Sequence, residues 1–141
     1  MNNQDIDRIL KANSPLFRGV FSCDTLPKSN VRGLIVCNTD PESKPGEHWI
    51  AMYFDGDHGE YFDSSGRPPA KVFKDYLNSH CKHWIFNEKQ LQSAVSRFCG
   101  HYCVYYCLLR SRRVDLRRIV ATFTNDTGFN DVLVHNFICL R

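Results

Sequence analysis

The chain has 141 residues, of which 43% are hydrophobic and 23% charged, and its formal net charge is +3 at pH 7. These values are ordinary for a globular protein, and the length predicts a single domain, residues 1–141. No apolar run approaches the ~18 residues of a membrane span, so we expect no membrane association. The polar, acidic first ten residues do not resemble a secretory signal. The seven cysteines are an odd number without framework spacing, which favours an intracellular, reducing compartment.

The first half of the chain predicts one helix and three strands. The apolar stripe of a short N-terminal helix consists of Ile6, Ile9 and Leu10, and the helix ends at Ser14, before a proline. Residues 16–27 carry aromatic side chains around a glycine, and we expect an irregular segment there that lies over the core. Strands are predicted at 34–37, 48–54 and 60–63, the last two joined by a turn at 55–59.

The second half predicts helices around one more strand, at 83–87. Two prolines, at 68 and 69, open the first helix. A second helix follows Cys99, and two more precede and follow a break at 124–128. The side chains expected to face the core are Val72, Phe73, Tyr76 and Leu77 in the first helix, Val114, Leu116, Ile119, Val120 and Phe123 in the third, and Leu133, Val134, Phe137 and Ile138 in the last. This pattern is α+β: a small antiparallel or mixed sheet packed against a central helix, with flanking helices.

Residues 92–109 predict a polar loop that runs into an apolar helix, with Cys99 and Gly100 at the junction. Unpaired N–H groups and the helix dipole stabilise a thiolate at such a position. Gly100 would let a substrate carbonyl approach the backbone, and the loop can bring the amide of Gln92 beside the sulfur. Together these groups would make a nucleophile with an oxyanion hole. Alternatively, Cys99 is simply a small buried apolar residue.

A second set of residues lies on the predicted hairpin. His48 opens one strand and Asp63 closes the other, and antiparallel pairing places these two ends side by side. An imidazole oriented by a carboxylate is what a cysteine nucleophile needs for proton transfer. Taken singly, His48 could be a surface histidine at a strand end and Asp63 an acid that starts a turn. Taken with Cys99 and Gln92, that reading requires four independent coincidences, so we favour a catalytic site.

These residues also carry a resemblance to a known family. The segments Gly46-Glu47-His48-Trp49, Tyr61 to Gly66, and Gln92…Cys99-Gly100 resemble the signature of the adenovirus-type cysteine proteases (adenain). Their wider relatives are the proteases of ubiquitin-like modifiers. The order His, acid, Gln, Cys is theirs, whereas in papain-like enzymes the cysteine comes first. The resemblance covers roughly residues 5–110. It departs at Asp63, where adenovirus enzymes carry Glu, and in a shorter segment after the cysteine.

The resemblance implies a cysteine endopeptidase that cleaves precursor proteins of a virus or virus-like element next to glycine. Its catalytic residues would be His48, Asp63 and Cys99, with Gln92 and Gly100 in the oxyanion hole. It would act in the virion or the host-cell nucleus, without a metal or small-molecule cofactor. Two alternatives remain: a protease that removes or matures a ubiquitin-like modifier, and an inactive DNA-binding or capsid scaffold protein.

The resemblance also raises the question of activators. Cys81 lies eleven positions before Gln92 (92 − 81), where adenovirus enzymes carry a cysteine that forms a disulfide with an activating peptide. Its neighbours His80, Lys82 and His83 predict an exposed thiol with a lowered pKa; the alternative is an unpaired surface cysteine. Adenovirus enzymes use DNA as a cofactor, and a basic run either contacts DNA phosphates or is a solvated helix face. That run is Arg110, Arg112, Arg113, Arg117 and Arg118.

The other cysteines are expected to be structural. Cys103 and Cys107 follow Cys99 at four-residue steps, which indicates core packing along one helix face. Zinc sites usually bring two close pairs of cysteines, and the sequence has no C-x-x-C pair, so we expect no metal. The remaining three, at 23, 37 and 139, lie in apolar or mixed segments.

Overall fold

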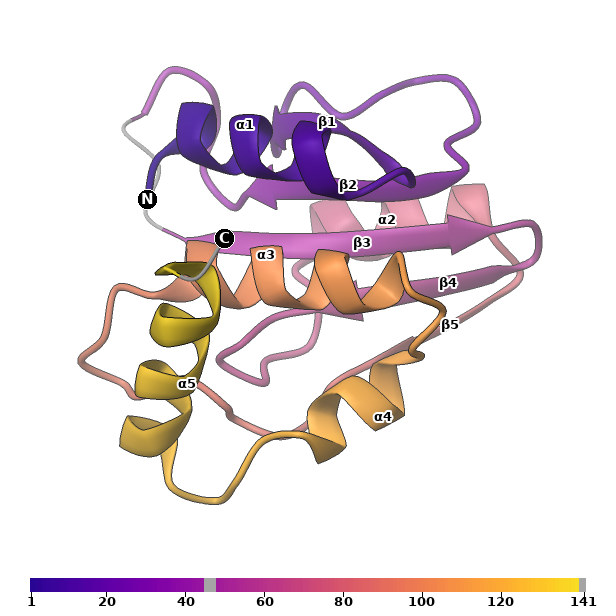
Figure 1. Cartoon of the computed structure of the whole chain (residues 1–141). Coiled ribbons are helices and arrows are strands. Elements are labelled where there is room, and N and C mark those ends of the chain that lie inside the picture. Colours follow the sequence, from indigo (N-terminus) through magenta and orange to yellow (C-terminus); the bar gives the residue numbers. More distant parts are fainter. Residues whose placement is uncertain (45–47, 140–141) are drawn as a thin grey trace.

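The computed structural model describes residues 1–44 and 48–139 (Figure 1). Within these ranges the chain forms one five-stranded mixed sheet and five helices, so the α+β prediction is confirmed. The strands are β1 (Phe17–Ser22), β2 (Gly33–Asn38), β3 (Trp49–Asp55), β4 (His58–Phe62) and β5 (His83–Phe86). The helices are α1 (Asn3–Asn13), α2 (Lys71–His80), α3 (Cys99–Arg110), α4 (Leu116–Ala121) and α5 (Thr127–Cys139).

The strands lie in the order β1-β2-β3-β4-β5. The three central strands are antiparallel, and β1 and β5 add to them in parallel, so those two form the sheet edges. The β3–β4 turn is tighter than predicted, because Asp55 already pairs with His58. Gly56 in that turn takes φ +60°, a conformation that glycine adopts without strain. The open end of the hairpin therefore brings the start of β3 next to the end of β4.

The sheet is buried on both faces, and alternate residues of β2 and β3 point to opposite sides. Leu34 and Val36 join the larger core, which includes α1, α3, α4 and α5, while Ile35 and Cys37 join a smaller core under α2. Figure 1 shows α2 behind the sheet and the other helices in front of it. Burial on both faces explains why β2 has no polar alternation in its sequence.

Helix α3 is the centre of the larger core. Nine of its residues are buried, and the rings of Tyr102 and Tyr106 are completely enclosed. Tyr106 stacks on Phe62 of β4, with ring centroids 4.8 Å apart. The helix therefore has a fixed position against the sheet, and its first residue, Cys99, is held at the open end of the β3–β4 hairpin. The predicted central helix that carries the cysteine is confirmed.

The structure corrects two sequence predictions of the fold. The segment at 16–27 is not irregular, since most of its first half is strand β1. A register shift between Phe17 and Gly19, with Gly19 at φ +148°, interrupts the alternation that would have indicated a strand. Val72 does not face inward: its side chain is exposed on α2, while Phe73 and Leu77 fill the smaller core. In the described ranges, no helix is long and apolar enough to span a bilayer.

Candidate active site

The site is assembled at the open end of the β3–β4 hairpin. His48 directly precedes β3 and Asp63 directly follows β4, so strand pairing brings them together. The Nε2 atom of His48 lies 2.7 Å from Oδ1 of Asp63. The Asp63 side chain is nearly buried, whereas that of His48 is about a quarter exposed, at 27%. The pairing leaves Nδ1 of His48 available to the thiol. Gly46 and Glu47, which the resemblance also includes, lie outside the described residues.

Asp63 is oriented by residues that the sequence analysis did not single out. The backbone N–H and the hydroxyl of Ser65 donate to Oδ1 of Asp63, at 2.8 and 2.6 Å. The side chain of Asn87 bonds to both backbone groups of Asp63, accepting from its N–H at 2.9 Å and donating to its C=O. These contacts therefore hold the Asp63 carboxylate in place independently of His48. The Asp-Ser-Ser-Gly segment is a turn signature that could have indicated the Ser65 contacts.

Cys99 is the first residue of α3, and its side chain is 7% exposed. Phe98, which precedes the helix, offers no side-chain cap to the first-turn N–H groups. These groups therefore remain available to an anion at the helix N-terminus. Backbone N–H groups of Gly100 and Trp49 interact with the sulfur, as does His48.

The electrostatics of the three side chains favour a thiolate–imidazolium pair. Burial lowers the pKa of His48, but Asp63 and Cys99 outweigh it and raise that pKa to about 9. Burial raises the pKa of the Cys99 thiol, but His48 and the N–H groups around the sulfur outweigh it and hold the pKa below its ordinary value. For Asp63, burial raises the pKa, and the contact with His48 more than reverses it. Both shifts act in the direction that favours a thiolate beside a protonated imidazole.

Gln92 lies in the same region, in the loop before α3. Its side-chain carbonyl accepts from the Ser64 hydroxyl at 2.5 Å, and its amide nitrogen donates to the carbonyl and hydroxyl of Ser96, both at 3.0 Å. The backbone N–H of Gln92 donates to the Ser64 carbonyl. These contacts hold the amide in one orientation, with its N–H groups turned toward the loop that leads to Cys99.

The role predicted for the missing side chain of Gly100 needs correction. A Cβ atom built on Gly100 would lie 3.4 Å from Met1 and 3.5 Å from Ile6, so this side of the residue faces the N-terminal segment rather than a substrate. The glycine therefore allows α1 to pack closely on α3. The Gly100 N–H group, in contrast, interacts with the Cys99 sulfur.

A hollow of about 320 Å³ opens beside these residues. Its lining consists of His48, Ser65, Arg67, Gln90, Gln92, Ser93, Ala94 and Ser96. The residue types are polar or small, and none of them is acidic. His48, which interacts with the Cys99 sulfur, forms part of this lining.

The prediction of an exposed, acidified Cys81 is wrong. The Cys81 side chain is half-buried against the smaller core, and its thiol donates to the Leu77 carbonyl at 3.2 Å. Burial raises the pKa of this thiol. The sulfur also lies so close to Gly59 of β4 that an added Cβ there would be 2.6 Å away. The polar neighbours of Cys81 in sequence do not surround its sulfur, because the residue ends α2 and turns inward.

The five arginines of the basic run differ in their exposure to solvent. Arg110 is not a surface residue: its side chain is 14% exposed, its Nε lies 3.2 Å from Glu60, and its guanidinium lies over the ring of Tyr53 at 4.1 Å. It is therefore unavailable to phosphates, and its inclusion in a DNA-contacting set is wrong. The other four members are exposed: Arg112 and Arg113 lie between α3 and α4, and Arg117 and Arg118 lie in α4.

The remaining cysteines differ among themselves. Cys37, Cys103 and Cys107 are buried, and burial raises the pKa of each thiol. Cys23 is half-buried and Cys139 is exposed. All seven thiols are free, and the described part of the chain has no group of three or more Cys, His, Asp or Glu placed to hold a metal.

Two further polar contacts hold the loop before α3 in place. Asp131 of α5 accepts from the hydroxyl of Tyr102 at 2.7 Å and from the N–H of Ser93. Asn130 donates to the carbonyl of Leu91 at 3.1 Å. Helix α5 thus anchors both ends of the segment that carries Gln92. No sequence pattern indicated this, because the partners are separated by more than one element.

Two viral proteases are similar in sequence to this chain. The chain is 28% identical to a cysteine protease of African swine fever virus over 72% of its length and 42% of that protein's. It is 30% identical to the protease of bovine adenovirus 4 over 68% of its length and 58% of that protein's. The chain is similar to viral cysteine proteases. It spans about half the length of these two relatives. No protein-family model matches it.

A crystal structure of the African swine fever virus protease shares the fold. It superposes with a TM-score of 0.58 and 20% identity, covering 95% of this chain and 66% of that protein. At this level of identity the likeness concerns the fold alone. Together with the two relatives, it confirms the resemblance to adenovirus-type cysteine proteases drawn from the sequence motifs.

Proposed function

We propose that this chain is a cysteine endopeptidase that cleaves viral precursor proteins, with Cys99 as nucleophile and His48 and Asp63 as its proton-transfer pair. The observation that carries the proposal is the thiol at the N-terminus of α3, beside an imidazole that lies 2.7 Å from a buried carboxylate. The relatives support it by their names, since both are viral proteases.

The chemistry needs only these groups, a peptide and water. The Cys99 thiolate attacks the carbonyl carbon of the scissile peptide and forms a tetrahedral intermediate. As this collapses, the C–N bond breaks, the leaving amine takes the proton of His48, and a thioester remains. Water then attacks the thioester while His48 accepts its proton, which releases a carboxylic acid and returns Cys99 to the thiolate. Asp63 keeps the imidazole oriented throughout and stabilises its protonated form.

The intermediate carries an oxyanion, which requires fixed donors. We propose the Gln92 amide and the first N–H groups of α3 for this role. In the free structure the Gln92 amide donates to Ser96, so substrate binding must draw one of its N–H groups toward the oxyanion. Such tightening on substrate binding is common for catalytic hydrogen bonds.

Cleavage next to glycine is the part of the proposal that rests on the resemblance to adenovirus enzymes. The first test is therefore a peptide that ends in Gly-Gly and carries a thiol-directed electrophile, followed by intact-mass measurement. We expect one adduct on the parent and on Cys139→Ser, which removes the exposed thiol, and none on Cys99→Ala. Unchanged labelling of Cys99→Ala would contradict the assignment of the nucleophile. Viral-type peptides and modifier conjugates, offered as substrates, then separate the two protease classes.

We also propose an activating peptide that joins the sheet along β5. This strand is an edge, and a hollow of about 690 Å³ lies between it and α4, lined in part by Trp84, Phe86 and Val120. A disulfide to Cys81 requires its thiol to leave the Leu77 carbonyl first. The test is the cleavage rate with and without a cysteine-bearing peptide of the precursor, in the parent and in Cys81→Ala. Full activity of the bare chain would contradict the proposal.

A further inference from the structure

The hollow beside His48 contains a charged residue that the mechanism does not use. Arg67 lines it together with His48 and Gln92. No hydrogen bond or ion pair joins its guanidinium to any residue in the described ranges, whereas the side chains of the other polar lining residues are hydrogen-bonded. An arginine beside a reaction centre, with its five N–H donors unspent, is available to a ligand.

The wall that carries Arg67 is fixed. The preceding turn places Gly66 at φ +76°, and a Cβ there would lie 2.7 Å from backbone atoms of Lys89 and Gln90. On the other side of that contact, the N–H groups of Leu91 and Gln92 donate to the Ser64 carbonyl at 2.9 and 3.0 Å. The backbone of the turn is therefore locked against the loop, and the long side chain of Arg67 starts from the rim of the hollow.

The other polar groups of the hollow are donors as well. Gln90 uses its amide nitrogen once, toward the Gln92 carbonyl at 3.0 Å, and retains a second N–H. The Ser93 hydroxyl accepts from the N–H of Val95, and its own proton has no acceptor among the described residues. Two acids contact lining residues and both are engaged: Oδ1 of Asp63 by His48 and Ser65, and Oδ1 of Asp131 by Tyr102 and Ser93. The hollow thus offers spare donors and a positive charge, and no carboxylate of its own.

We propose that Arg67 is a specificity-determining residue that selects substrates with an aspartate or glutamate close to the cleaved bond. A carboxylate accepts two parallel N–H bonds from a guanidinium, a geometry that an amide side chain cannot reproduce with the same charge. The position along the substrate follows from the lining, because His48 and Gln92 act on the scissile peptide itself. This inference rests on the proposed protease function, whose substrate class it narrows.

The test compares peptides that differ only by Glu or Gln at one position, scanned over the residues on both sides of the cleavage site. For the parent we expect kcat/KM to be about fivefold higher with Glu at one of these positions, the effect of a partly exposed ion pair. In Arg67→Gln the ratio of the two rates falls to about one. In Arg67→Glu the preference passes to a peptide with Lys at that position. Equal rates for Glu and Gln at every position in the parent would overturn the proposal.

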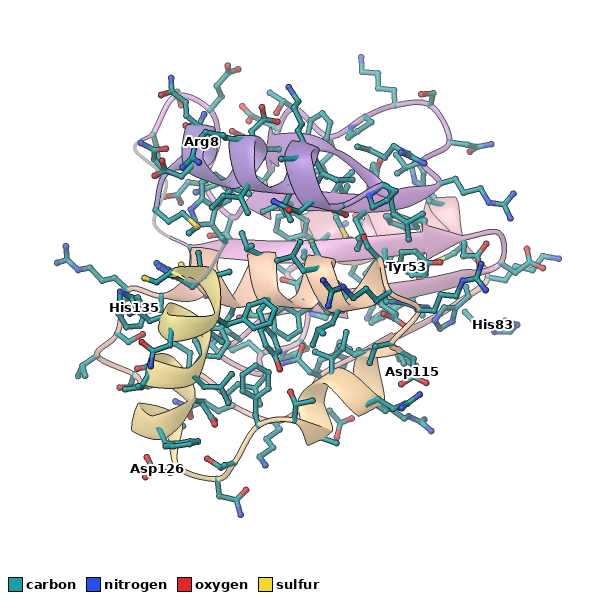
Figure 2. All side chains as sticks on the ribbon, viewed as in Figure 1. Arg8, Tyr53, His83, Asp115, Asp126 and His135 are labelled. Carbon is teal, nitrogen blue, oxygen red and sulfur yellow. The ribbon has the colours of Figure 1, made fainter. Side chains whose placement is uncertain are left out.

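A control variant and a binding measurement complete the test. Arg8→Gln removes an arginine of α1 (Figure 2) that is 74% exposed and is not part of the lining, and the Glu preference should persist in it. Binding of the same peptides to Cys99→Ala, read by fluorescence anisotropy, measures the preference without turnover. If no peptide is cleaved, the protease proposal fails, while the binding ratio with and without Arg67 still decides this one. A binding ratio that Arg67→Gln leaves unchanged would refute it.

Discussion

Each end of helix α3 lies near a carboxylate of the β4 segment: Asp63, directly after β4, near its N-terminus, and Glu60, within β4, near its C-terminus. The two carboxylates differ in what surrounds them. At the N-terminal end, Asp63 holds His48 beside Cys99. At the C-terminal end, Glu60 is 1% exposed and lies within 3.2 Å of both the Tyr106 hydroxyl and Arg110. Arg110 in turn covers Tyr53, near the far end of β3 (Figure 2).

The Asp63 cluster and the Glu60 cluster contain similar groups but differ in their cations and in their access to water. Around Glu60 the buried cation is an arginine, which stays charged at all working pH values, and His58, whose side chain is 44% exposed, also lies 3.1 Å from the carboxylate. Around Asp63 the cation is a histidine, which can give up its proton where an arginine cannot, and one side of it opens on a hollow. We therefore expect the first cluster to contribute to stability and the second to reactivity.

The largest effect on activity should come from the Asp63 cluster, at the N-terminal end of α3. Replacing Cys99 or His48 by alanine should lower kcat/KM by about 10⁴-fold or more, because the nucleophile and its base act as one unit. Thermal unfolding should stay close to that of the parent, which separates lost chemistry from lost fold. Activity of Cys99→Ala equal to the parent's would remove the basis of the comparison.

Changes to the Glu60 cluster, at the C-terminal end of α3, should lower the stability of the fold instead of the activity. Glu60→Gln removes the counter-charge of Arg110, a side chain that is 14% exposed, and should cost about 3 kcal/mol in the free energy of unfolding. Its kcat/KM per folded molecule should be unchanged. Urea unfolding gives the measurement, with Glu88→Gln, an exposed position, as the matched control. A stable Glu60→Gln variant with reduced activity would reverse the assignment of the two ends.

The next prediction asks whether Gln92 takes part in catalysis together with Cys99 and His48. Gln92→Ala should lower kcat by about 10²-fold, the usual loss for one oxyanion donor. Ser64→Ala leaves the amide in place but removes the hydroxyl that orients it, at 2.5 Å, so its loss should be smaller. Single-turnover rates with a fluorogenic peptide measure both. A change in KM alone would assign Gln92 to binding rather than to the oxyanion.

The pH profile distinguishes the two carboxylates directly. The reactive pair requires Cys99 deprotonated and His48 protonated, so kcat/KM should rise as the thiol ionises and fall again around pH 9, where His48 loses its proton. In Asp63→Asn the carboxylate that raises the pKa of His48 is gone, and the falling limb should move to lower pH. Some activity should remain, because Asp63 orients rather than transfers the proton. In Glu60→Gln the falling limb should stay in place.

The smallest effect concerns the surface beyond the Glu60 cluster. We propose that the exposed arginines after α3 contact DNA phosphates, so Arg112→Gln, Arg113→Gln and Arg117→Gln together should flatten the salt dependence of DNA binding. Arg110 is excluded from this set because Glu60 and Tyr53 already hold it. Anisotropy titrations over a range of salt concentrations give the slope. Absence of binding at low salt would leave these arginines as a solvated face.

The amino-acid sequence by itself determined every element except β1, and the order of the chemical groups along the chain. The apolar stretch up to residue 109 predicted a helix after Cys99, and the turn residues at 55–59 predicted the hairpin. Together they implied that His48 and Asp63 would meet. These inferences succeed because helical period, hairpin pairing and turn chemistry are local properties, each set by a short stretch of chain.

The tertiary structure alone decided which side chains remain available for binding or reaction. Arg110 and Cys81 have polar neighbours in sequence, yet both turn inward, toward Glu60 and toward Gly59. Strand β1 forms because β2 pairs with it in parallel, despite the irregularity at Gly19. Arg67 gave no signal in the sequence and acquires its place beside His48 only when the turn at Gly66 packs on the loop before α3. In each case the decisive partner is distant in the chain, so no local pattern could specify it.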